Sequence, residues 1–289
     1  MENTANAAQL LGEKELFVFD MDGTIYLEDR VFPFAVRFIR HLRAHGKRVL
    51  FFTNNASRAS DFYMERLTRM GFAPARDEIM SSGDVTAAYL LHHRRGKSVY
   101  LLGTESLRAQ FTAQGIPLVP EAAEQADIVV SSFDTELTYR KLTCACTAVR
   151  NGAEYFCTHP DYNCPTVGGF LPDSGAIAAL ITASTGVKPT FFGKPYAQTV
   201  QMITAITQTP RDRMCFFGDR LYTDIAVGVR HGVCAVLVLT GETTAEMAES
   251  AAKDCRPDLI FPSLAEADRC MFRHRTGRIN TNRGDYYGF

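Results

Sequence analysis

The chain lacks a long apolar run and a signal-like N-terminus. None of its 289 residues lie in a stretch that approaches the roughly 18 consecutive apolar residues of a membrane-spanning helix. The segment before Phe17 has no basic part followed by an apolar part, which argues against a secretory signal and favours a frayed leader. We therefore expect no association with a membrane.

An excess of positive charge is also missing. Lys and Arg number 31 against 32 Asp and Glu, so the formal net charge is −1. A dedicated nucleic-acid binder usually carries a basic excess, so we expect no nucleic-acid polymer as a partner. Hydrophobic residues are 46% and charged residues 22% of the chain, which is ordinary for a folded domain and argues against disorder.

Cysteine is too sparse for a disulfide scaffold. The chain has 8 cysteines and no CxxC pair. Cys144 and Cys146 form a CxC, but no matching pair of Cys or His lies nearby at zinc spacing. We expect eight reduced thiols in a cytoplasmic protein.

What the chain does have is a regular alternation of strand and helix patterns. Short apolar runs predict strands at 15–20, 47–53, 98–103, 127–131, 154–158, 214–218, 234–239 and 259–261. Apolar stripes predict helices at 33–45, 60–70, 104–114, 138–151, 174–185, 195–206 and 223–231. A capping box, Thr243-x-x-Glu246, opens one more helix. Such alternation predicts an α/β fold with a parallel sheet.

The length suggests about two domains. The pattern of strands and helices places one of them inside the other along the chain. We expect a Rossmann-like, doubly wound parallel core from residues 1–81 and 187–289, interrupted by an inserted α/β domain at 82–186. Glycine and proline near 81–83 and 186–189 mark the hinges. Within the insertion, residues 159–172 predict a long Pro/Gly/Asn-rich loop, and loops of that length are often functional.

The sharpest motif, Asp20-Met21-Asp22-Gly23-Thr24, directly follows the first strand. Ligands of open α/β sheets bind at the carboxyl ends of strands. Two adjacent carboxylates raise each other's pKa unless a cation lies between them, and oxygen ligands favour Mg²⁺. Taken alone, the same letters are more typical of a plain polar turn.

Three further strand ends carry polar groups. Thr53, Asn54 and Asn55 supply a hydroxyl and two amides, and a Thr hydroxyl with the next backbone N–H can hold a phosphate oxygen. Lys194, between Gly193 and Pro195, is a point charge suited to phosphate or aspartate. Asp219, followed by Asp224, adds an acidic pair after a later strand.

In order and in strand context, these motifs resemble those of the haloacid dehalogenase (HAD) superfamily of phosphatases. DMDGT resembles its first motif, Thr53 its second, Lys194 its third and GDRLYTD its fourth. Little sequence separates the first two motifs, whereas the long stretch before Lys194 leaves room for a cap domain at the second insertion point.

Further strings resemble the NagD-type, para-nitrophenyl-phosphatase-like branch with a class IIA cap. They are DGTIYL, TNNASR, FDTELTYRKL and GKP. The resemblance implies a phosphatase for small phosphomonoesters of the nucleotide, sugar or glycerol phosphate, or pyridoxal phosphate type. It also implies Mg²⁺ dependence, an aspartyl-phosphate intermediate and, as in many relatives, a homodimer through the cap.

The resemblance assigns roles to individual residues. Asp20 is the expected nucleophile. Asp22 is the general acid for the leaving oxygen and then the base for water. The expected Mg²⁺ ligands are the Asp20 side chain, the Asp22 backbone carbonyl and Asp219, with Asp224 acting through water or in the outer layer of ligands.

The same resemblance outlines the substrate pocket. Thr53, the Asn54 backbone and Lys194 are expected to cradle phosphate; Asn55 is either a further contact or a helix-entry cap. The loop with His159 and Asp161 is expected to read the leaving group.

Two positions of this loop depart from the family. Relatives often carry Asn where His159 stands, and usually Gly where Asp173 stands. His159 is either a substrate contact or an ordinary loop residue, and Asp173 is favoured as the N-cap of the next helix. Tyr162 and Phe170 either stack on a base or simply fill the loop.

Two other functions use the same residues. A phosphotransferase or phosphomutase would share the aspartyl-phosphate but needs a site that excludes water. A non-catalytic phosphate-binding scaffold is disfavoured because the motif residues are intact, and a dehalogenase is disfavoured because Asp22 is present. The basic segment after Met271 is expected to be a solvated tail.

Overall fold

Two parallel sheets organise the chain in the computed structural model, which describes residues 2–166 and 168–272. The larger sheet has the order β14-β13-β12-β1-β4-β5. Its strands are β1 (Leu16–Asp20), β4 (Arg48–Thr53), β5 (Ile79–Ser81), β12 (Met214–Gly218), β13 (Cys234–Val238) and β14 (Leu259–Phe261). Every pair in it is parallel, with β1 held between β4 and β12.

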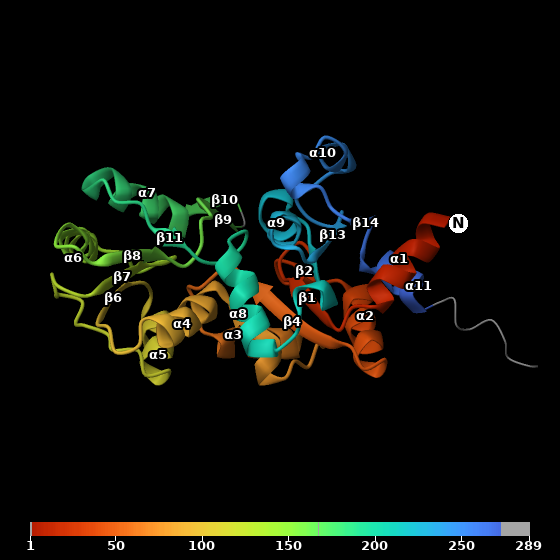
Figure 1. Cartoon of the computed structure of the whole chain (residues 1–289), viewed down its shortest axis with the longest axis horizontal. Helices are drawn as coiled ribbons and strands as arrows, with labels where there is room; N and C mark the ends of the chain where they lie inside the picture. The colour runs from red at the N-terminus through yellow and green to blue at the C-terminus, as the bar shows by residue number, and fades with distance from the viewer. Residues whose placement is uncertain (1, 167, 273–289) are drawn as a thin grey trace, which may run out of the picture.

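The smaller sheet has the order β11-β8-β7-β6 and belongs to the inserted part, which we call the cap. Its strands are β6 (Val99–Leu102), β7 (Ile128–Ser131), β8 (Glu154–Cys157) and β11 (Thr190–Phe191). The last of these lies beyond the predicted limit at 186. Figure 1 shows the two sheets in separate lobes along the long axis of the molecule.

Helices flank both sheets. They are α1 (Glu2–Gly12), α2 (Pro33–Ala44), α3 (Ser60–Arg69), α4 (Ser82–His93), α5 (Glu105–Ala113), α6 (Tyr139–Arg150), α7 (Ser174–Thr185), α8 (Ala197–Thr207), α9 (Ala226–His231), α10 (Ala245–Glu249) and α11 (Leu264–Phe272). Two short hairpins complete the fold: β2 (Tyr26–Leu27) with β3 (Arg30–Val31), and β9 (Asn163–Thr166) with β10 (Gly169–Pro172). In the described part of the chain no helix has the length and apolarity to cross a membrane.

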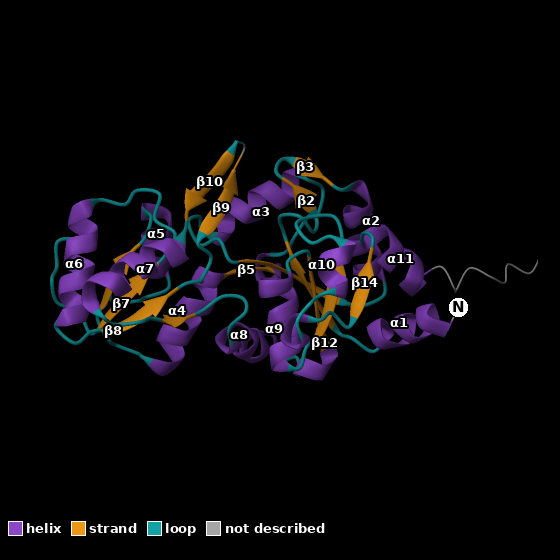
Figure 2. Cartoon of the chain, turned by 90° about the horizontal axis from the view of Figure 1, so that it is seen from above, coloured by secondary structure: helices purple, strands orange, loops and turns teal. Residues whose placement is uncertain are grey.

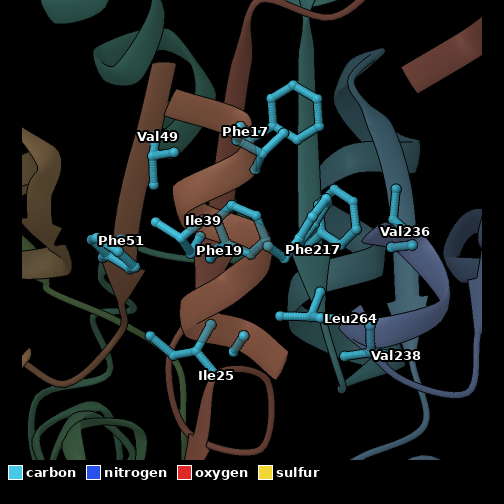
Figure 3. Packing of buried hydrophobic residues seen from close by; sticks show 14 of the residues in the cluster. Phe17, Phe19, Ile25, Ile39, Val49, Phe51, Phe217, Val236, Val238 and Leu264 are labelled. Atoms are coloured by element: carbon cyan, nitrogen blue, oxygen red, sulfur yellow. The ribbon is translucent and has the colours of Figure 1, made fainter. Parts of the chain in front are cut away.

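Strand alternation explains why helices cover both faces of the larger sheet. Successive side chains of a strand point to opposite faces. Phe17 and Phe19 of β1 pack in one hydrophobic cluster with Phe217 of β12 and with α2 and α11 (Figure 3). Leu16 and Val18 pack in a second cluster with α4 and α8. The predicted doubly wound α/β fold with an inserted α/β domain is confirmed.

The N-terminal segment corrects one expectation. We predicted a frayed leader, but α1 is an ordered helix that lies beside α11 (Figure 2). Leu11 has no exposed surface and Ala7 is 6% exposed, both in the cluster that includes Phe17. The sequence pattern was weak because only part of one helical face carries apolar side chains.

Two local expectations also need correction. The predicted loop 159–172 contains the β9–β10 hairpin, whose strands Figure 2 shows beside α3. The helix cap predicted at Thr243 is found one residue later in the structure, at Thr244. The Thr244 hydroxyl accepts the hydrogen bond from the Met247 N–H at the start of α10.

Candidate active site

The predicted motif residues converge at the carboxyl edge of the larger sheet. Asp20 ends β1, Thr53 ends β4 and Asp219 follows β12. Lys194 lies just before α8. A cavity of about 280 Å³ opens among them and is lined by Asp20, Asp22, Thr53, Asn54, Asn55 and Lys194, with Asp161 and Asp173 from the cap.

Lys194 joins two of the predicted carboxylates. Its Nζ donates to Asp20 Oδ1 at 2.5 Å and to Asp224 Oδ1 at 2.5 Å. Burial works against a charged ammonium, but Asp20 and Asp224 outweigh it and raise the pKa of Lys194. The lysine therefore stays protonated at the floor of the cavity.

Three carboxylates meet beside this lysine. Oxygen atoms of Asp20, Asp219 and Asp224 all lie within 4.8 Å of one another. Burial, with the charge of Asp224, raises the pKa of Asp20 to about 8 and that of Asp219 to about 6, although Lys194 opposes both shifts. One lysine thus leaves negative charge uncompensated among the three groups.

Asp219 has a free acceptor in this cluster. Its Oδ1 is buried and has no hydrogen-bond partner among the described residues, whereas its Oδ2 accepts from the Glu242 N–H at 2.7 Å. Buried polar atoms usually have a partner. The set of hard oxygen donors, with one of them orphaned, fits a cation such as Mg²⁺.

Glycines make the room for these carboxylates. A Cβ on Gly23 would come within 2.5 Å of Asp219 Oδ2, and one on Gly241 within 2.0 Å. Gly23 also has φ +83°, a left-handed conformation that side chains rarely adopt. Gly241 was not among the predicted site residues, and only the close approach of its segment to Asp219 reveals it.

Asp22 faces the cavity from the turn after β1. The Gly23 carbonyl of that turn accepts from Thr240 Oγ1 at 2.6 Å, which holds the turn against the core. Although the Asp22 side chain is exposed to the cavity, the surrounding walls reduce its solvation and raise its pKa; the charges of Arg66 and Arg220 partly oppose this. A raised pKa suits a carboxyl that must give and take a proton near neutral pH.

The residues after β4 form a compact turn. Thr53 Oγ1 accepts from the Asn55 N–H at 3.1 Å, and Asn55 Oδ1 accepts from the N–H and hydroxyl of Ser57. The alternative of Asn55 as a helix-entry cap is excluded, since α3 has Ala59 at its N-cap. Asn55 instead shapes the wall of the cavity.

Asn54 connects three segments. Its Oδ1 accepts from the Lys194 N–H at 2.8 Å, and its Nδ2 donates to the Lys194 carbonyl at 3.0 Å. The same Nδ2 donates to Asp161 Oδ2 of the cap at 3.1 Å. Asn54 therefore holds the backbone of the lysine segment and contacts the cap loop at the same time.

The cap loop places its predicted residues differently. Asp161 lines the cavity, but His159 is fully buried behind it and is not part of the cavity wall. His159 Nε2 lies 2.8 Å from Asp173 Oδ1, which also accepts from the Ser174 N–H at the start of α7. Asp173 is thus the N-cap of α7, as predicted, and the His159 ring pairs with it.

Several cavity residues escaped sequence reasoning. Arg58, Arg66, Tyr26 and Tyr63 also line this cavity, and Arg66 lies over the Tyr26 ring, 4.6 Å from its centroid. Arg220 follows Asp219 and pairs with Glu242 at 3.1 Å. The signal in the sequence was that Tyr26, Arg58 and Arg220 stand inside the strings DGTIYL, TNNASR and GDRLYTD.

A second, larger cavity adjoins the first. It measures about 760 Å³ and shares Asp22, Asp161 and Arg220 with the smaller one. Its walls include five side chains that are at least 36% exposed, namely Leu27, Tyr162, Phe170, Tyr196 and Tyr222. The smaller cavity is charged, and the larger one is predominantly apolar.

Comparison with known proteins agrees with this geometry. Residues 17–117 match the family described as haloacid dehalogenase-like hydrolase, and residues 191–267 match a second HAD-hydrolase-like family. An acid sugar phosphatase of Staphylococcus aureus is 35% identical over 251 residues, which cover 87% of this chain and 95% of that one.

Solved structures give the same result. A 4-nitrophenylphosphatase of Thermotoga maritima superposes with a TM-score of 0.85 at 42% identity, covering 91% of this chain and 99% of that one. A glycerol phosphate phosphatase of Mycobacterium tuberculosis, solved with calcium, has a TM-score of 0.81 at 30% identity, covering 89% and 75% of the two chains. The chain therefore belongs to the haloacid dehalogenase-like hydrolases and is a phosphatase of their NagD-type branch.

Proposed function

We propose that this phosphatase hydrolyses small phosphomonoesters with Mg²⁺ through an aspartyl-phosphate on Asp20. One observation carries the proposal: Asp20 lies at the floor of a charged cavity, and Asp22 faces the same cavity from the following turn. A nucleophile and a group that transfers protons are thereby placed around one point where phosphorus can sit.

Two displacements complete the reaction. An oxygen of Asp20 bonds to phosphorus while the bond from phosphorus to the ester oxygen breaks, and Asp22 gives its proton to that departing oxygen. Asp22, now ionised, removes a proton from water as the water oxygen attacks the phosphorus. The bond between phosphorus and Asp20 then breaks, and inorganic phosphate leaves.

The phosphate oxygens are proposed to lie against Thr53 and Lys194. The Thr53 hydroxyl, the Asn54 N–H and the Lys194 ammonium supply donors around the cavity floor. The charge on Lys194 is favourable for a phosphate that gains charge density at its oxygens as it transfers. Asn54 contributes further by orienting the lysine backbone.

The proposed metal ligands are Asp20, the Asp22 backbone carbonyl and Asp219, with Asp224 behind them. The orphaned Oδ1 of Asp219 and the uncompensated charge of the cluster support a divalent cation there. When bound, the cation supplies Lewis-acid stabilisation of the transferring oxygens. Asp224, hydrogen-bonded to Lys194 and to the Arg220 N–H, orients the lysine from behind.

For the leaving group we favour a planar ring. The larger cavity continues from Asp22, and aromatic side chains dominate its exposed apolar surface. Exposed apolar patches of this kind usually mark a binding surface. A nucleoside base, a pyridine ring or an aryl group can stack on Tyr162, Phe170 or Tyr222, whereas a polyol gains little from them.

Phosphate release from a panel tests both parts of the proposal. The panel comprises nucleoside monophosphates, pyridoxal phosphate, para-nitrophenyl phosphate, sugar phosphates and glycerol phosphate, each with and without Mg²⁺. We expect release only with metal, and a kcat/KM for the best ring-bearing substrate at least tenfold above that for any polyol phosphate.

Variants of residues in the larger cavity test the planar-ring leaving group separately from the phosphatase function. Tyr162→Ala and Tyr222→Ala are expected to raise KM for ring-bearing substrates and leave glycerol phosphate unaffected. Leu180→Ala, at an exposed position on α7, is the matched control. A polyol phosphate as the best substrate would contradict the ring assignment alone, and no turnover of any panel member would contradict the proposed function.

A further inference from the structure

His159 and Asp173 form one of the most buried ion pairs in the described part of the chain. The exposed fractions of the two side chains are 0% and 5%. Most other ion pairs have at least one side chain that is considerably exposed; the exceptions are the pairs of Lys194 with Asp20 and Asp224, in the active site, and Lys141–Asp134. A pair buried so deeply costs desolvation, so a gain in stability does not by itself account for it.

The pair closes the base of the cap loop. His159 precedes residues 160–172 and Asp173 follows them, so their contact joins the two ends of the segment that carries β9 and β10. The Asp173 N–H also donates to the Tyr162 carbonyl at 2.9 Å, and the Gly175 N–H donates to the Asp161 carbonyl at 2.8 Å. The residues that face the two cavities therefore lie on a loop whose ends are fastened together.

The hydrogen-bond pattern indicates that both ring nitrogens of His159 carry a proton. Nδ1 lies 3.0 Å from Thr158 Oγ1 and 3.3 Å from Ser82 Oγ. Both hydroxyls donate elsewhere, Thr158 to Ser132 and Ser82 to the Asn54 carbonyl, which favours Nδ1 as the donor. Nε2 donates to the Asp173 carboxylate, which makes the pair an imidazolium and a carboxylate.

The charged groups around the ring are consistent with that state. Burial lowers the pKa of His159, but the charges of Asp173 and Asp161 outweigh it and raise the value above the ordinary one, with Lys194 in opposition. The carboxylates are on the cap, and the lysine is on the segment before α8. No other titratable group among the described residues has a comparable part in the shift.

His159 also abuts the segment that carries Lys194. A Cβ on Gly193 would lie 2.8 Å from Asn54 Oδ1 and 2.9 Å from the His159 Cβ, so these atoms are in close contact. The ring reaches the Asn54 carbonyl through Ser82, and Asn54 holds the Lys194 backbone. One buried side chain is thus in contact with the cap loop and with the supports of the phosphate cradle.

We propose that His159 is a positioning residue, which acts through Asp173 and Ser82 to hold the cap loop in the position that substrate binding requires. The inference rests on the proposed function, because it assigns the cap loop to the leaving group. His159 touches no substrate. Its charge fixes where Asp161 and Tyr162 lie relative to Asn54 and Lys194.

Two substitutions of His159 make the proposal specific. Gln can place an amide N–H where Nε2 lies and keep the bond to Asp173, whereas Asn places its amide near Nδ1 and leaves Asp173 buried without its partner. We expect His159→Asn to raise KM at least tenfold with kcat within threefold of the wild type, and His159→Gln to stay within threefold in both. His92→Asn, at an exposed position on α4, is the matched control.

Two measurements do not depend on turnover. Nitrogen-15 NMR of the His159 ring is expected to show both nitrogens protonated at pH 7 in the wild type, and one of them deprotonated in Asp173→Asn. Limited proteolysis is expected to cleave residues 160–172 faster in His159→Asn than in the wild type or His159→Gln, while circular dichroism is unchanged.

The outcomes are distinct. A neutral ring at pH 7, or an unchanged KM and cleavage rate in a folded His159→Asn, would overturn the positioning role. If the wild type hydrolyses no panel member, the proposed function fails, and the NMR and proteolysis results still decide the role of His159. If His159→Asn does not fold, Asp173→Asn with the wild-type histidine provides the same comparison.

Discussion

At the scale of single residues, Asp20 has to satisfy two opposed requirements. A nucleophile must be ionised, yet Asp20 is withdrawn from water beside Asp219 and Asp224. These surroundings raise its pKa to about 8. The site therefore concentrates negative charge that destabilises the folded protein until a cation or a substrate-bound state compensates for it.

Asp20→Asn tests this conflict directly. The amide is isosteric but cannot attack phosphorus, so we expect turnover to fall at least about 10³-fold. Because one of three crowded carboxylates becomes neutral, the melting temperature without metal should equal or exceed that of the wild type. Steady-state kinetics and thermal unfolding measure both effects; substantial activity in the variant would disprove the nucleophile assignment.

Asp22 is expected to matter for proton transfer rather than for binding. Asp22→Ala removes the acid and base of both displacements, so kcat should fall at least about 100-fold. A substrate with a good leaving group, such as para-nitrophenyl phosphate, needs less protonation and should lose less in the first step. Near-normal kcat for poor leaving groups would argue against the proposed role.

The environment of His159 leads us to expect that the stability of the folded protein depends on pH. Its folded pKa is raised, so the folded state binds the proton more tightly than the unfolded chain does. The stability that this gives is fully present below the ordinary histidine pKa of about 6.5 and is lost as the pH rises through the folded value.

Urea unfolding at several pH values checks this prediction. The free energy of unfolding of the wild type should exceed that of His159→Gln most at about pH 5.5. The difference should narrow above neutrality. A difference that is independent of pH would mean that the His159 ring does not change its charge in this range.

At the scale of elements, α1 shows how composition can mislead. Its polar residues predicted a frayed leader, but Leu11 is completely buried and contributes to the cluster under β1. The helix packs against α11, so the two ends of the described chain stabilise each other. Only contacts distant in sequence reveal this packing.

Leu11→Ala measures the contribution of α1. Removing a buried leucine side chain should lower the free energy of unfolding by about 2–5 kcal/mol. KM should not change, because the residue is remote from both cavities. Gln9→Ala on the exposed face is the control and should stay within about 0.5 kcal/mol of the wild type. Equal effects of the two substitutions would indicate that α1 does not pack in solution.

The cap loop is a second element whose pattern was incomplete. Proline, glycine and asparagine predicted a loop at 159–172, but four residues on each side pair as β9 and β10. A hairpin with both faces largely exposed has no alternation of polar and apolar residues to reveal it. Closure of its ends by His159 and Asp173 supplies order that local propensity does not.

At the scale of the whole molecule, the cap and the core share their interior. Leu16 and Val18 of the large sheet belong to the same hydrophobic cluster as Val99 and Ile128 of the cap. The cavities are bounded by both sheets' loops, with Asn54 from the core bonded to Asp161 from the cap. Substrate binding therefore depends on how these two parts are held together.

Removal of the metal tests the entire site. Chelation should abolish hydrolysis and Mg²⁺ should restore it. Mg²⁺ should also raise the melting temperature, because a ligand that binds only the folded state stabilises it. In Asp219→Asn the rise should be lost, whereas Asp254→Asn, at an exposed position, should keep it. Full activity with a chelator would contradict the proposed cofactor.

The basic segment after Met271 falls mainly outside the described residues. Phe272 is the exception, since its ring stacks on His45 with the centroids 4.4 Å apart. The expected solvated tail thus concerns residues 273–289 and stays a prediction. The domain boundaries and the homodimer through the cap also stay predictions.

The sequence by itself determined the alternation of strands and helices and the positions of the acidic, hydroxyl and lysine motifs. It did so because parallel strands end at one edge, so residues that follow successive strands meet there whatever the connections between them. Asp20, Thr53 and Asp219 follow three strands of one sheet and needed no further information to be brought together, whereas Lys194 lies just before α8.

Only the tertiary structure decided which other side chains face the cavities. The sequence left His159 as either a substrate contact or an ordinary loop residue, and the structure pairs its ring with Asp173 across the base of the loop. The aromatic wall takes Leu27 and Tyr222 from the core and Tyr162 from the cap, segments with no common sequence pattern. Burial and pairing depend on distances between remote segments, and a local pattern of residues does not encode those distances.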